Sequence, residues 1–247
     1  MGECLLCDNS SQFHIYNKLL LKCTSCGFIT ANLDTEHEKI QDIYSKKYFK
    51  GEEYDDYIRD KQIIQNNFIE RIKILEKIIP TDKLKKILEI GCAYGFFGEL
   101  IRKRWNCKYL GIDIVEEAIE YASKILNLNV INKDYLYIKN TKIEFDTCIM
   151  LDVIEHLPDP VAIVKKLYKE ISREGYIVIT TGDIGSLLAK IQGRKWRMIH
   201  PPSHLHYFNK KSIKKLLNTN GFDIVDISYP IIKRSLKQIF YSLFILT

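Results

Sequence analysis

Apolar residues along the chain occur in two patterns, short continuous runs and stripes at helical spacing. The runs predict strands over residues 86–90, 108–112, 129–132, 145–151 and 176–180. The stripes predict helices over residues 60–79, 116–126, 161–171 and 211–218, and another helix is expected to begin after residue 95. Strands that alternate with helices in this way predict an α/β fold with a doubly wound parallel sheet.

The pattern is less definite towards the C-terminus. A sixth strand is expected over residues 222–228, after the last of the predicted helices. The apolar residues of 235–247 fit either an amphipathic helix or a final strand. With lysine and arginine beside it, that tail is also a candidate for contact with a membrane surface or for dimerisation, although packing in the core explains it as well.

A glycine turn follows the first strand of the predicted sheet. Gly91 and Gly95 allow the backbone to turn sharply and to approach a ligand closely, and the helix that follows offers free N–H groups. The next strand ends in Asp113, about 20 residues further on, where an acidic side chain can accept hydrogen bonds from ribose hydroxyls. These features predict a cofactor that contains a nucleoside. A dinucleotide remains the alternative, although Ala93 breaks the Gly-x-Gly-x-x-Gly pattern.

Two Cys-x-x-Cys pairs stand near the N-terminus, with 15 residues between them. Cys4, Cys7, Cys23 and Cys26 at this spacing predict a tetrahedral zinc site in a small ribbon over residues 1–32. Disulfides are the weaker alternative because nothing in the sequence points to an oxidising compartment. A shell of four thiolates has no open position, so the zinc is expected to be structural.

Composition indicates an ordinary globular protein. The chain has 247 residues, of which 46% are hydrophobic, enough for one large domain and a small module. No signal-peptide pattern and no apolar run of membrane-spanning length is present, so a cytoplasmic location is expected. The formal charge of +6 is concentrated in residues 181–247, which carry eleven Lys/Arg against three Asp/Glu. This excess is either a solvated surface or a site for an anionic partner.

Four motifs together resemble those of class I S-adenosylmethionine-dependent methyltransferases. They are Glu89–Gly95, Gly111–Asp113, the acidic end of the third strand, and Phe145–Pro160. The paired cysteines and the stretch from Gly193 to Phe208 are similar to a bacterial and archaeal subgroup that carries a zinc ribbon and is associated with glycan or secondary-metabolite pathways. The resemblance implies a Rossmann-like methyltransferase fold, a methyltransferase activity, S-adenosylmethionine as cofactor and one structural zinc.

The resemblance also implies a domain organisation. A zinc ribbon over residues 1–32 is followed by a helical connector or cap over 33–80 and a cofactor-binding domain over 81–247, with a substrate insertion over 181–208. A cluster of aromatic and charged residues at 44–57 belongs to the connector. Its aromatic side chains either anchor the connector or cover the cofactor.

For the methionine part of the cofactor, the resemblance implies contacts with the glycine turn. Glu89 would orient the loop and the amino group, and Gly91, Cys92 and Gly95 would lie against the methionine. Ala93 departs from the family, which often has glycine there, and its methyl group slightly narrows the approach.

The remaining implied contacts follow the second and third strands. Asp113 would hold the ribose hydroxyls, and Ile114, the next residue, would also contact the cofactor. Asp134 with Tyr135 would face the adenine.

The segment after the fourth strand joins the cofactor site to the acceptor site. Leu151 and Asp152 would line the methyl-donor pocket. Asp152, Glu155 and His156 have a spacing that resembles the divalent-metal triplet of some quinone-pathway O-methyltransferases, although helix capping by Glu155 and His156 is the preferred explanation.

A hydroxyl acceptor must lose a proton when it attacks the methyl group, and histidine has a suitable intrinsic pKa. The insertion over 181–208 supplies the candidates His204, preferred, and His200, with His156 as a third. Nearby cations are candidate phosphate contacts for a phosphate-bearing acceptor: Arg194, Lys195 and Arg197.

The sequence therefore favours a methyltransferase that acts on an oxygen of a small molecule, sugar or glycan. A nucleic-acid methyltransferase is the alternative, because the ribbon and the basic C-terminal quarter could hold RNA. Residues 151–154 lack the Asn/Asp-Pro-Pro-Tyr signature of base amino methylation. A scaffold that binds the cofactor without catalysis is a third hypothesis.

Overall fold

The computed structural model describes residues 3–33, 57–139 and 144–230, which fall into two compact units. The sheet unit comprises the described parts of Tyr44–Met150, Glu170–Val178 and Val225–Thr247. The ribbon unit comprises those of Met1–Ile43, Leu151–Lys169 and Ile179–Ile224. Each unit is described separately below.

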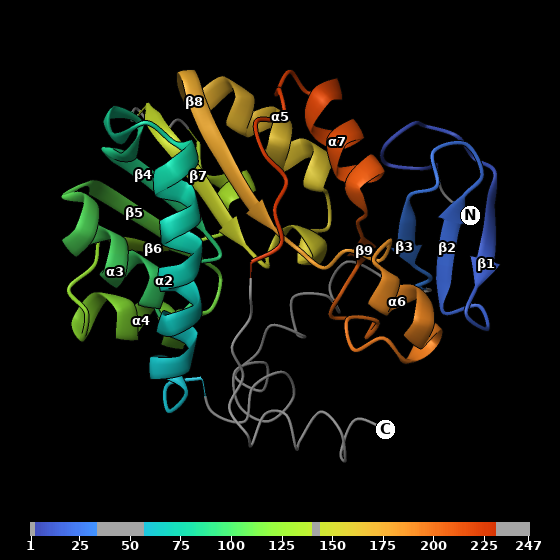
Figure 1. The fold of residues 1–247 in the computed structure, drawn as a ribbon, viewed down its shortest axis with the longest axis horizontal. Helices are drawn as coiled ribbons and strands as arrows, with labels where there is room; N and C mark the ends of the chain where they lie inside the picture. The colour runs from blue at the N-terminus through green and yellow to red at the C-terminus, as the bar shows by residue number, and fades with distance from the viewer. Residues whose placement is uncertain (1–2, 34–56, 140–143, 231–247) are drawn as a thin grey trace. The chain divides into compact units, whose positions relative to one another are not determined.

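A five-stranded sheet organises the sheet unit (Figure 1). Its strands are β4 (Lys86–Ile90), β5 (Lys108–Asp113), β6 (Val130–Asn132), β7 (Phe145–Leu151) and β8 (Ile171–Thr180). Their order is β6-β5-β4-β7-β8, and β4 pairs in parallel with both β5 and β7. This order, third-second-first-fourth-fifth along the chain, is that of doubly wound α/β folds, so the predicted fold class is confirmed.

Three helices pack with this sheet, namely α2 (Lys61–Ile78), α3 (Phe96–Trp105) and α4 (Glu116–Lys124). Helix α3 contacts β5, α4 contacts β5 and β6, and α2 packs on α3 (Figure 1). Because helices cover the sheet, its central strands are rich in apolar residues, and Ile87 and Leu88 of β4 are fully buried. Pro80 follows the end of α2, as predicted. Short 3₁₀ turns are η2 (Thr81–Leu84) and η3 (Tyr135–Tyr137).

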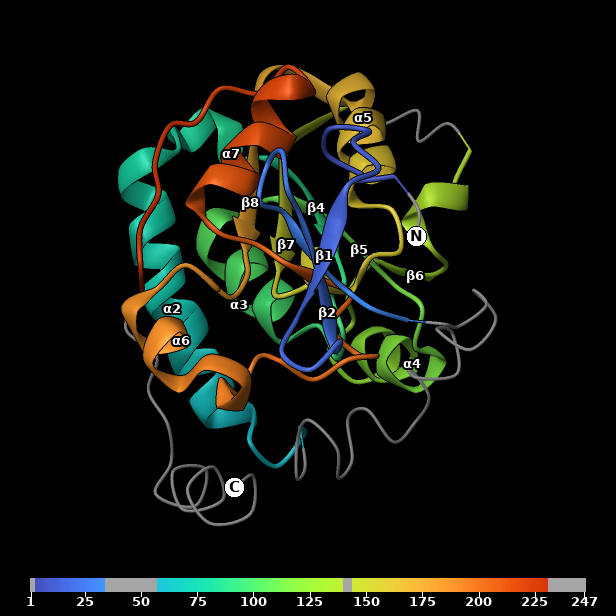
Figure 2. The same ribbon diagram turned by 90° about the vertical axis from the view of Figure 1, so that its right-hand side faces the viewer.

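An antiparallel sheet forms the centre of the ribbon unit (Figure 2). Its strands, in spatial order, are β1 (Gln12–Ile15), β2 (Leu20–Cys23), β3 (Ile29–Ala31) and β9 (His206–Tyr207). The helical elements of this unit are η4 (Ile154–His156), α5 (Pro160–Glu170), α6 (Leu187–Gln192), η5 (Gly193–Lys195) and α7 (Lys210–Thr219). The strands β1, β2 and β3 lie within the predicted ribbon over residues 1–32, and the pairing of β3 with β9 was not predicted.

The expected sixth strand over residues 222–228 is wrong, because this stretch has no regular secondary structure. Its alternation of apolar and polar residues slips by one at Ile224 and Val225, so no single face is apolar throughout, and Val225 is 67% exposed. The strand predicted at 176–180 begins earlier, at Ile171, where the helix had been expected to continue. The aromatic cluster up to residue 56 and the tail at 235–247 lie outside the described residues.

Within the part of the chain that the structure describes, no helix has the length and apolar character required to cross a bilayer.

We expect the contact between α3 and β5 to depend on Gly98, since a Cβ there would overlap the ring of Tyr109. Gly98→Ala should therefore lower the free energy of unfolding by about 1–3 kcal/mol through overpacking. Chemical denaturation measures this change. Lys103→Ala, at an exposed position of the same helix, should change it by less than about 0.5 kcal/mol. Equal stability of Gly98→Ala and the unmodified protein would contradict the close packing.

Candidate functional site

The turn after β4 alternates between left-handed and ordinary backbone conformations. Gly91, Ala93 and Gly95 have φ angles of 72°, 46° and 74°. The Gly91 N–H donates to the carbonyl of Ile112 at 2.8 Å, which attaches the turn to the end of β5. Helix α3 begins directly after Gly95, so its first N–H groups lie at this turn.

The carboxylate of Asp113 connects the ends of β4 and β5. One oxygen accepts the N–H of Ala93 at 2.8 Å, and the other accepts the N–H of Val115 at 2.9 Å. Burial raises the pKa of Asp113, and the backbone donors oppose this effect. Each carboxylate oxygen has a further lone pair, so the group can also accept hydrogen bonds from ligand hydroxyls.

Glu89 is a second buried carboxyl at the same strand end. The hydroxyl of Tyr109 donates to it at 2.5 Å. Burial, together with the charge of Asp113, raises the pKa of Glu89 to about 8, although the bond from Tyr109 acts in the opposite direction. Near neutral pH this carboxyl is therefore largely protonated, and a neighbouring cation would favour its ionised form.

The side chain of Cys92 is buried, and burial raises the pKa of its thiol. The thiol is thus neutral and belongs to the core. Any ligand contact of Cys92 would come from its backbone.

Aromatic rings surround the glycine turn. Tyr57 stacks on Tyr94 and Phe96, with ring centroids 5.6 and 5.3 Å apart, and Tyr121 packs edge-on against Tyr94 at 5.4 Å. Tyr57 is the described member of the aromatic cluster noted in the sequence. It packs on the turn itself.

The residues expected at the adenine have different environments. Asp134 accepts the N–H of Leu136 at 2.8 Å and caps η3. Tyr135 is buried, and its hydroxyl donates to Glu170 at 2.6 Å. Ile114, next to Asp113, is 47% exposed. The Tyr135 side chain is thus buried, whereas the Ile114 side chain has a large exposed apolar surface on which a ligand could pack.

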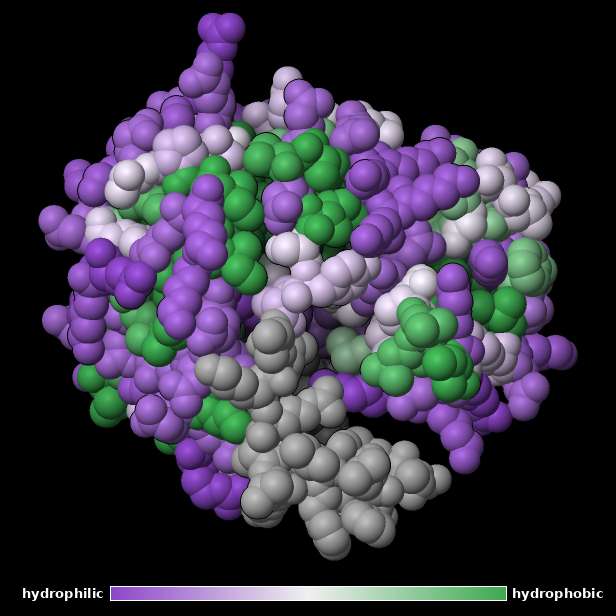
Figure 3. All heavy atoms as spheres, in the orientation of Figure 1, coloured by the Kyte–Doolittle hydropathy of each residue, from purple (hydrophilic) through white to green (hydrophobic). Residues whose placement is uncertain are grey.

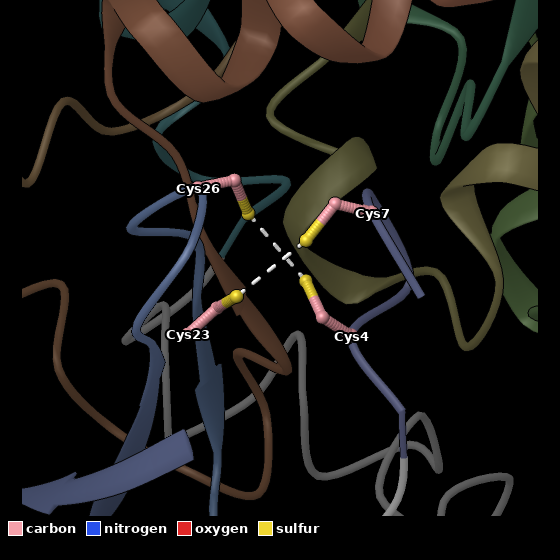
Figure 4. A group of neighbouring side chains, drawn as sticks. All are labelled: Cys4, Cys7, Cys23 and Cys26. Atoms are coloured by element: carbon pink, nitrogen blue, oxygen red, sulfur yellow. Dashed lines mark hydrogen bonds between the residues drawn. The ribbon is translucent and has the colours of Figure 1, made fainter. Parts of the chain in front are cut away.

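In the ribbon unit, the four N-terminal cysteines point towards a common centre (Figure 4). The sulfurs of Cys4 and Cys26 are 3.6 Å apart, those of Cys7 and Cys23 are 3.5 Å apart, and none forms a disulfide. Four sulfurs at 2.3 Å from zinc would be separated by about 3.8 Å, so the arrangement fits a tetrahedral zinc site. Burial raises the pKa of Cys4, so a bound cation would be needed to stabilise its thiolate.

The cysteines belong to the hydrophobic core of the ribbon unit. They share one cluster with Phe28, which directly precedes β3, and with residues of η4, of α5, of the segment after β9 and of α7. These residues are Ile154, Val164, Phe208 and Leu216. The ribbon is therefore packed into this unit rather than attached at its edge.

Backbone hydrogen bonds connect the ribbon to the predicted insertion. Thr30 of β3 pairs with His206 of β9, and the Ala31 N–H donates to the carbonyl of Leu205 at 2.8 Å. The Leu205 N–H in turn donates to the carbonyl of Glu155 at 2.9 Å. Ribbon, insertion and η4 thus form one continuous backbone network.

Three histidine rings lie in contact next to this network. The centroid of His204 is 4.5 Å from that of His156 and 3.9 Å from that of His200. The Nδ1 atoms of His156 and His204 lie 2.8 Å from the carbonyls of Ser203 and Met198. A carbonyl only accepts hydrogen bonds, so each Nδ1 carries the proton and each neutral ring presents Nε2 as an acceptor.

Burial keeps His156 and His204 neutral. It lowers the pKa of His156 to about 4 and, with the neighbouring His156 and His200, that of His204 to about 2. His206, stacked on Phe28 at 5.6 Å, has its pKa lowered to about 4, also by burial.

A possible cation-binding group includes Glu155, His156 and His204, whose candidate ligand atoms lie within 4.8 Å of one another. Asp152, which the sequence spacing suggested as a third ligand, is not in this group. Its carboxylate instead accepts a hydrogen bond from the hydroxyl of Thr180 at 2.8 Å.

A family model described as a methyltransferase domain matches residues 61–227, more than half of the chain. The chain belongs to this methyltransferase family.

Known relatives and structures agree with this assignment. The ubiquinone biosynthesis O-methyltransferase of Neisseria meningitidis serogroup A is 26% identical over 155 residues, which cover 58% of this chain and 65% of that protein. The magnesium protoporphyrin IX methyltransferase of Synechocystis, solved with bound S-adenosylhomocysteine, has a TM-score of 0.56 at 16% identity and covers 79% of this chain and 94% of its own. A methyltransferase of Thermotoga maritima, titled a possible histamine N-methyltransferase, has a TM-score of 0.55 at 20% identity, covering 68% and 77%. Both structures share the class I methyltransferase fold.

Within the methyltransferase domain, the structure brings several predicted site residues together. In the sheet unit, Glu89, Gly91, Cys92, Gly95 and Asp113 meet at the ends of β4 and β5.

In the ribbon unit, Asp152 and Thr180 meet after β7 and β8, and the three candidate histidines meet beside η4. Arg194, Lys195 and Arg197 are exposed. The cofactor and catalytic roles of all these residues stay predictions.

Two supporting side chains were missed in the sequence. Tyr109 holds Glu89, and Thr180 holds Asp152. The glycines at positions 98 and 111 indicate where the Tyr109 side chain packs, because a Cβ at Gly98 or Gly111 would collide with it. Thr180 is a polar residue at the end of its strand. The sequence alone does not show that this strand end lies beside Asp152, so the contact could not be predicted from it.

Histidine burial predicts a strong dependence of stability on acidity. The folded pKa values of His156, His204 and His206 lie below the ordinary value of 6.5, so unfolding takes up protons as pH falls below 6.5. Near pH 5 the three histidines take up about three protons on unfolding, whereas Glu89, with a folded pKa of about 8, releases nearly one, so the free energy of unfolding should fall by about 3 kcal/mol per pH unit. Denaturant unfolding at several pH values measures this slope.

His206→Phe should reduce the slope by about 1.4 kcal/mol per pH unit, because one of the three buried histidines no longer titrates. His14→Asn, at an exposed position of β1, should leave it unchanged. The comparison cancels any contribution from the cysteines. An unchanged slope in His206→Phe would mean that the folded protein protonates His206 normally.

Proposed function

We propose that this protein transfers the methyl group of S-adenosylmethionine to a hydroxyl oxygen of a small-molecule or glycan-like acceptor. The observation that carries the proposal is the buried carboxylate of Asp113 at the glycine turn, in a domain of the methyltransferase family. A buried acid with free lone pairs beside a left-handed turn suits a ribose with two hydroxyls.

S-adenosylmethionine would supply an electrophilic methyl group on a sulfonium. In the proposed site, the Gly91–Gly95 backbone lies against the methionine, Asp113 accepts the ribose hydroxyls and Ile114 covers part of the base. Glu89 would face the amino group, whose positive charge favours the ionised carboxyl. Leu151 and Asp152 are proposed to line the methyl-donor pocket.

For the acceptor, we propose that the histidine cluster removes the hydroxyl proton as the oxygen attacks the methyl carbon. His200, His204 and His156 are the candidates for this step, and burial holds His204 and His156 neutral. Relatives named ubiquinone biosynthesis O-methyltransferases support oxygen as the acceptor atom, although the match covers 65% of such a relative's length. A phosphate on the acceptor would suit Arg194, Lys195 and Arg197.

We propose that the cysteine cluster binds one structural zinc ion. The sulfur separations of 3.5 and 3.6 Å and the absence of a fifth donor in the described cluster support a closed shell.

Nucleic-acid methylation stays the second candidate because residues 184–222 contain eight Lys/Arg and no Asp/Glu. Such binding would weaken steeply with salt. A methyl-transfer rate that is insensitive to salt would argue against it.

We expect Asp113→Asn to weaken S-adenosylmethionine binding by at least about tenfold, since loss of a charged hydrogen-bond acceptor costs about 1.5–3 kcal/mol. Calorimetric titration measures the affinity. Labelled methyl transfer to hydroxylated acceptors, with identification of an ether product, tests the reaction itself.

Asp82→Asn, at an exposed acid of η2, is the control and should bind normally. Circular dichroism must show that both variants are folded. Full affinity in a folded Asp113→Asn would refute the cofactor site.

For zinc, metal analysis should find one ion per chain, and Cys4→Ser/Cys7→Ser should lose it because two of four ligands are gone. Cys107→Ser removes a cysteine outside the cluster and should keep the metal. Loss of zinc should also lower the thermal midpoint, since the cysteines share a core with Ile154 and Phe208. A purified native protein without zinc that folds normally would disprove the site.

A further inference from the structure

Helix α6 presents its large apolar side chains to solvent. Leu187, Leu188 and Ile191 are 75%, 59% and 74% exposed, and they form a hydrophobic patch on the surface (Figure 3). The small side chain of Ala189 is buried instead, against Leu20 and other residues of the ribbon-unit core. This is the reverse of an ordinary surface helix, in which the large apolar residues face the core.

The surroundings of the patch are basic. Lys190, Arg194, Lys195 and Arg197 are all exposed. The sequence has no Asp or Glu from residue 184 to residue 222, so no acidic side chain of this segment neutralises them. Three aliphatic side chains and four cations therefore occupy eleven consecutive residues.

This combination distinguishes between possible partners. A second copy of the chain would bring the same four cations opposite one another, which is electrostatically unfavourable in a two-fold interface. Single-stranded nucleic acid is generally held by aromatic stacking, whereas the exposed apolar residues of α6 are aliphatic. Aliphatic side chains beside uncompensated cations are typical of proteins that bind the surface of an anionic bilayer.

We propose that α6 and the basic segment after it form a peripheral membrane-binding surface. Leu187, Leu188 and Ile191 would enter the boundary between headgroups and acyl chains, and the cations would contact lipid phosphates. The charges select anionic lipids, and the apolar residues hold the protein at the surface. The membrane proposal does not rest on the proposed methyl transfer, although Arg194, Lys195 and Arg197 are also the candidate phosphate contacts of the acceptor.

Sedimentation with vesicles tests the proposal on the full-length protein. The protein should bind vesicles of phosphatidylglycerol and phosphatidylcholine, should bind pure phosphatidylcholine much less, and should be released by salt. Leu187→Ser/Leu188→Ser/Ile191→Ser should reduce the partition coefficient by at least about tenfold, because three inserted aliphatic side chains are lost. The positions are exposed, so the fold should survive, which thermal unfolding verifies.

Lys190→Gln/Arg194→Gln/Lys195→Gln should remove the preference for anionic lipid and the salt dependence. Arg197 is left unchanged because its charge acts on His204. Ile125→Ser is the matched control, since Ile125 is 66% exposed but lies on another part of the chain, and it should bind vesicles normally.

Three results would overturn the proposal. The unmodified protein could fail to bind anionic vesicles. The triple serine variant could bind as well as the unmodified protein, with binding lost only when residues 235–247 are removed, which would assign the contact to the tail. Finally, analytical ultracentrifugation could show a dimer that the serine variant abolishes, which would make the α6 patch a contact between copies.

Discussion

The buried carboxylate of Asp113 is the constraint on which the glycine turn and the proposed cofactor site depend. A carboxylate inside a protein is strongly destabilising unless donors surround it, and here the donors are backbone N–H groups of Ala93 and Val115. One belongs to the turn after β4 and the other to the turn after β5, so the same side chain sets both turns. The left-handed conformation of Ala93 follows from this demand, because it directs the N–H towards the carboxylate. A ligand with two hydroxyls would complete the hydrogen bonding of Asp113, so the interaction that shapes the two turns also suits the proposed binding of a ribose.

A comparable dependence exists in the ribbon unit. The cysteines pack on Ile154, one residue before Glu155, and the strand that follows the second pair of cysteines pairs with β9. The positions of the four cysteines, of η4 and of the insertion are therefore set by one hydrophobic core and one backbone network. A ribbon attached only by a linker could be lost without affecting the rest of the unit. This ribbon cannot, since its removal would expose Phe208 and leave β9 without its partner.

Local signals explain what the sequence predicted well. Continuous apolar runs such as Cys148–Leu151 indicate strands buried on both faces. The position of Asp113 about 20 residues after the glycine turn, and the spacing of the paired cysteines, indicate a ribose-binding and a metal-binding chemistry. The features that could not be predicted depend on contacts between residues far apart in the sequence or on the packing of a whole segment. The two residues of β9 have no pattern of their own and form a strand because β3 lies beside them. Residues 222–228 have suitable composition but a slipped alternation. The exposure of the large apolar residues of α6 could not be predicted from the sequence, because a buried helix can have the same apolar residues.

Burial also changes the order of the candidate bases. A pKa lowered from 6.5 to about 4 makes the imidazolium of His156 less stable by about 3 kcal/mol, and the corresponding figure for His204 is about 6 kcal/mol. His204 lies between the other two rings, so it would have to accept a proton in the least hydrated position of the cluster. His200 as a whole is less buried than His204, but its Nε2 atom is enclosed like the rest of the cluster. For the proposed proton removal, His204 is therefore the least suited of the three candidates, and the Met198 carbonyl fixes it as a neutral ring that packs between its two neighbours.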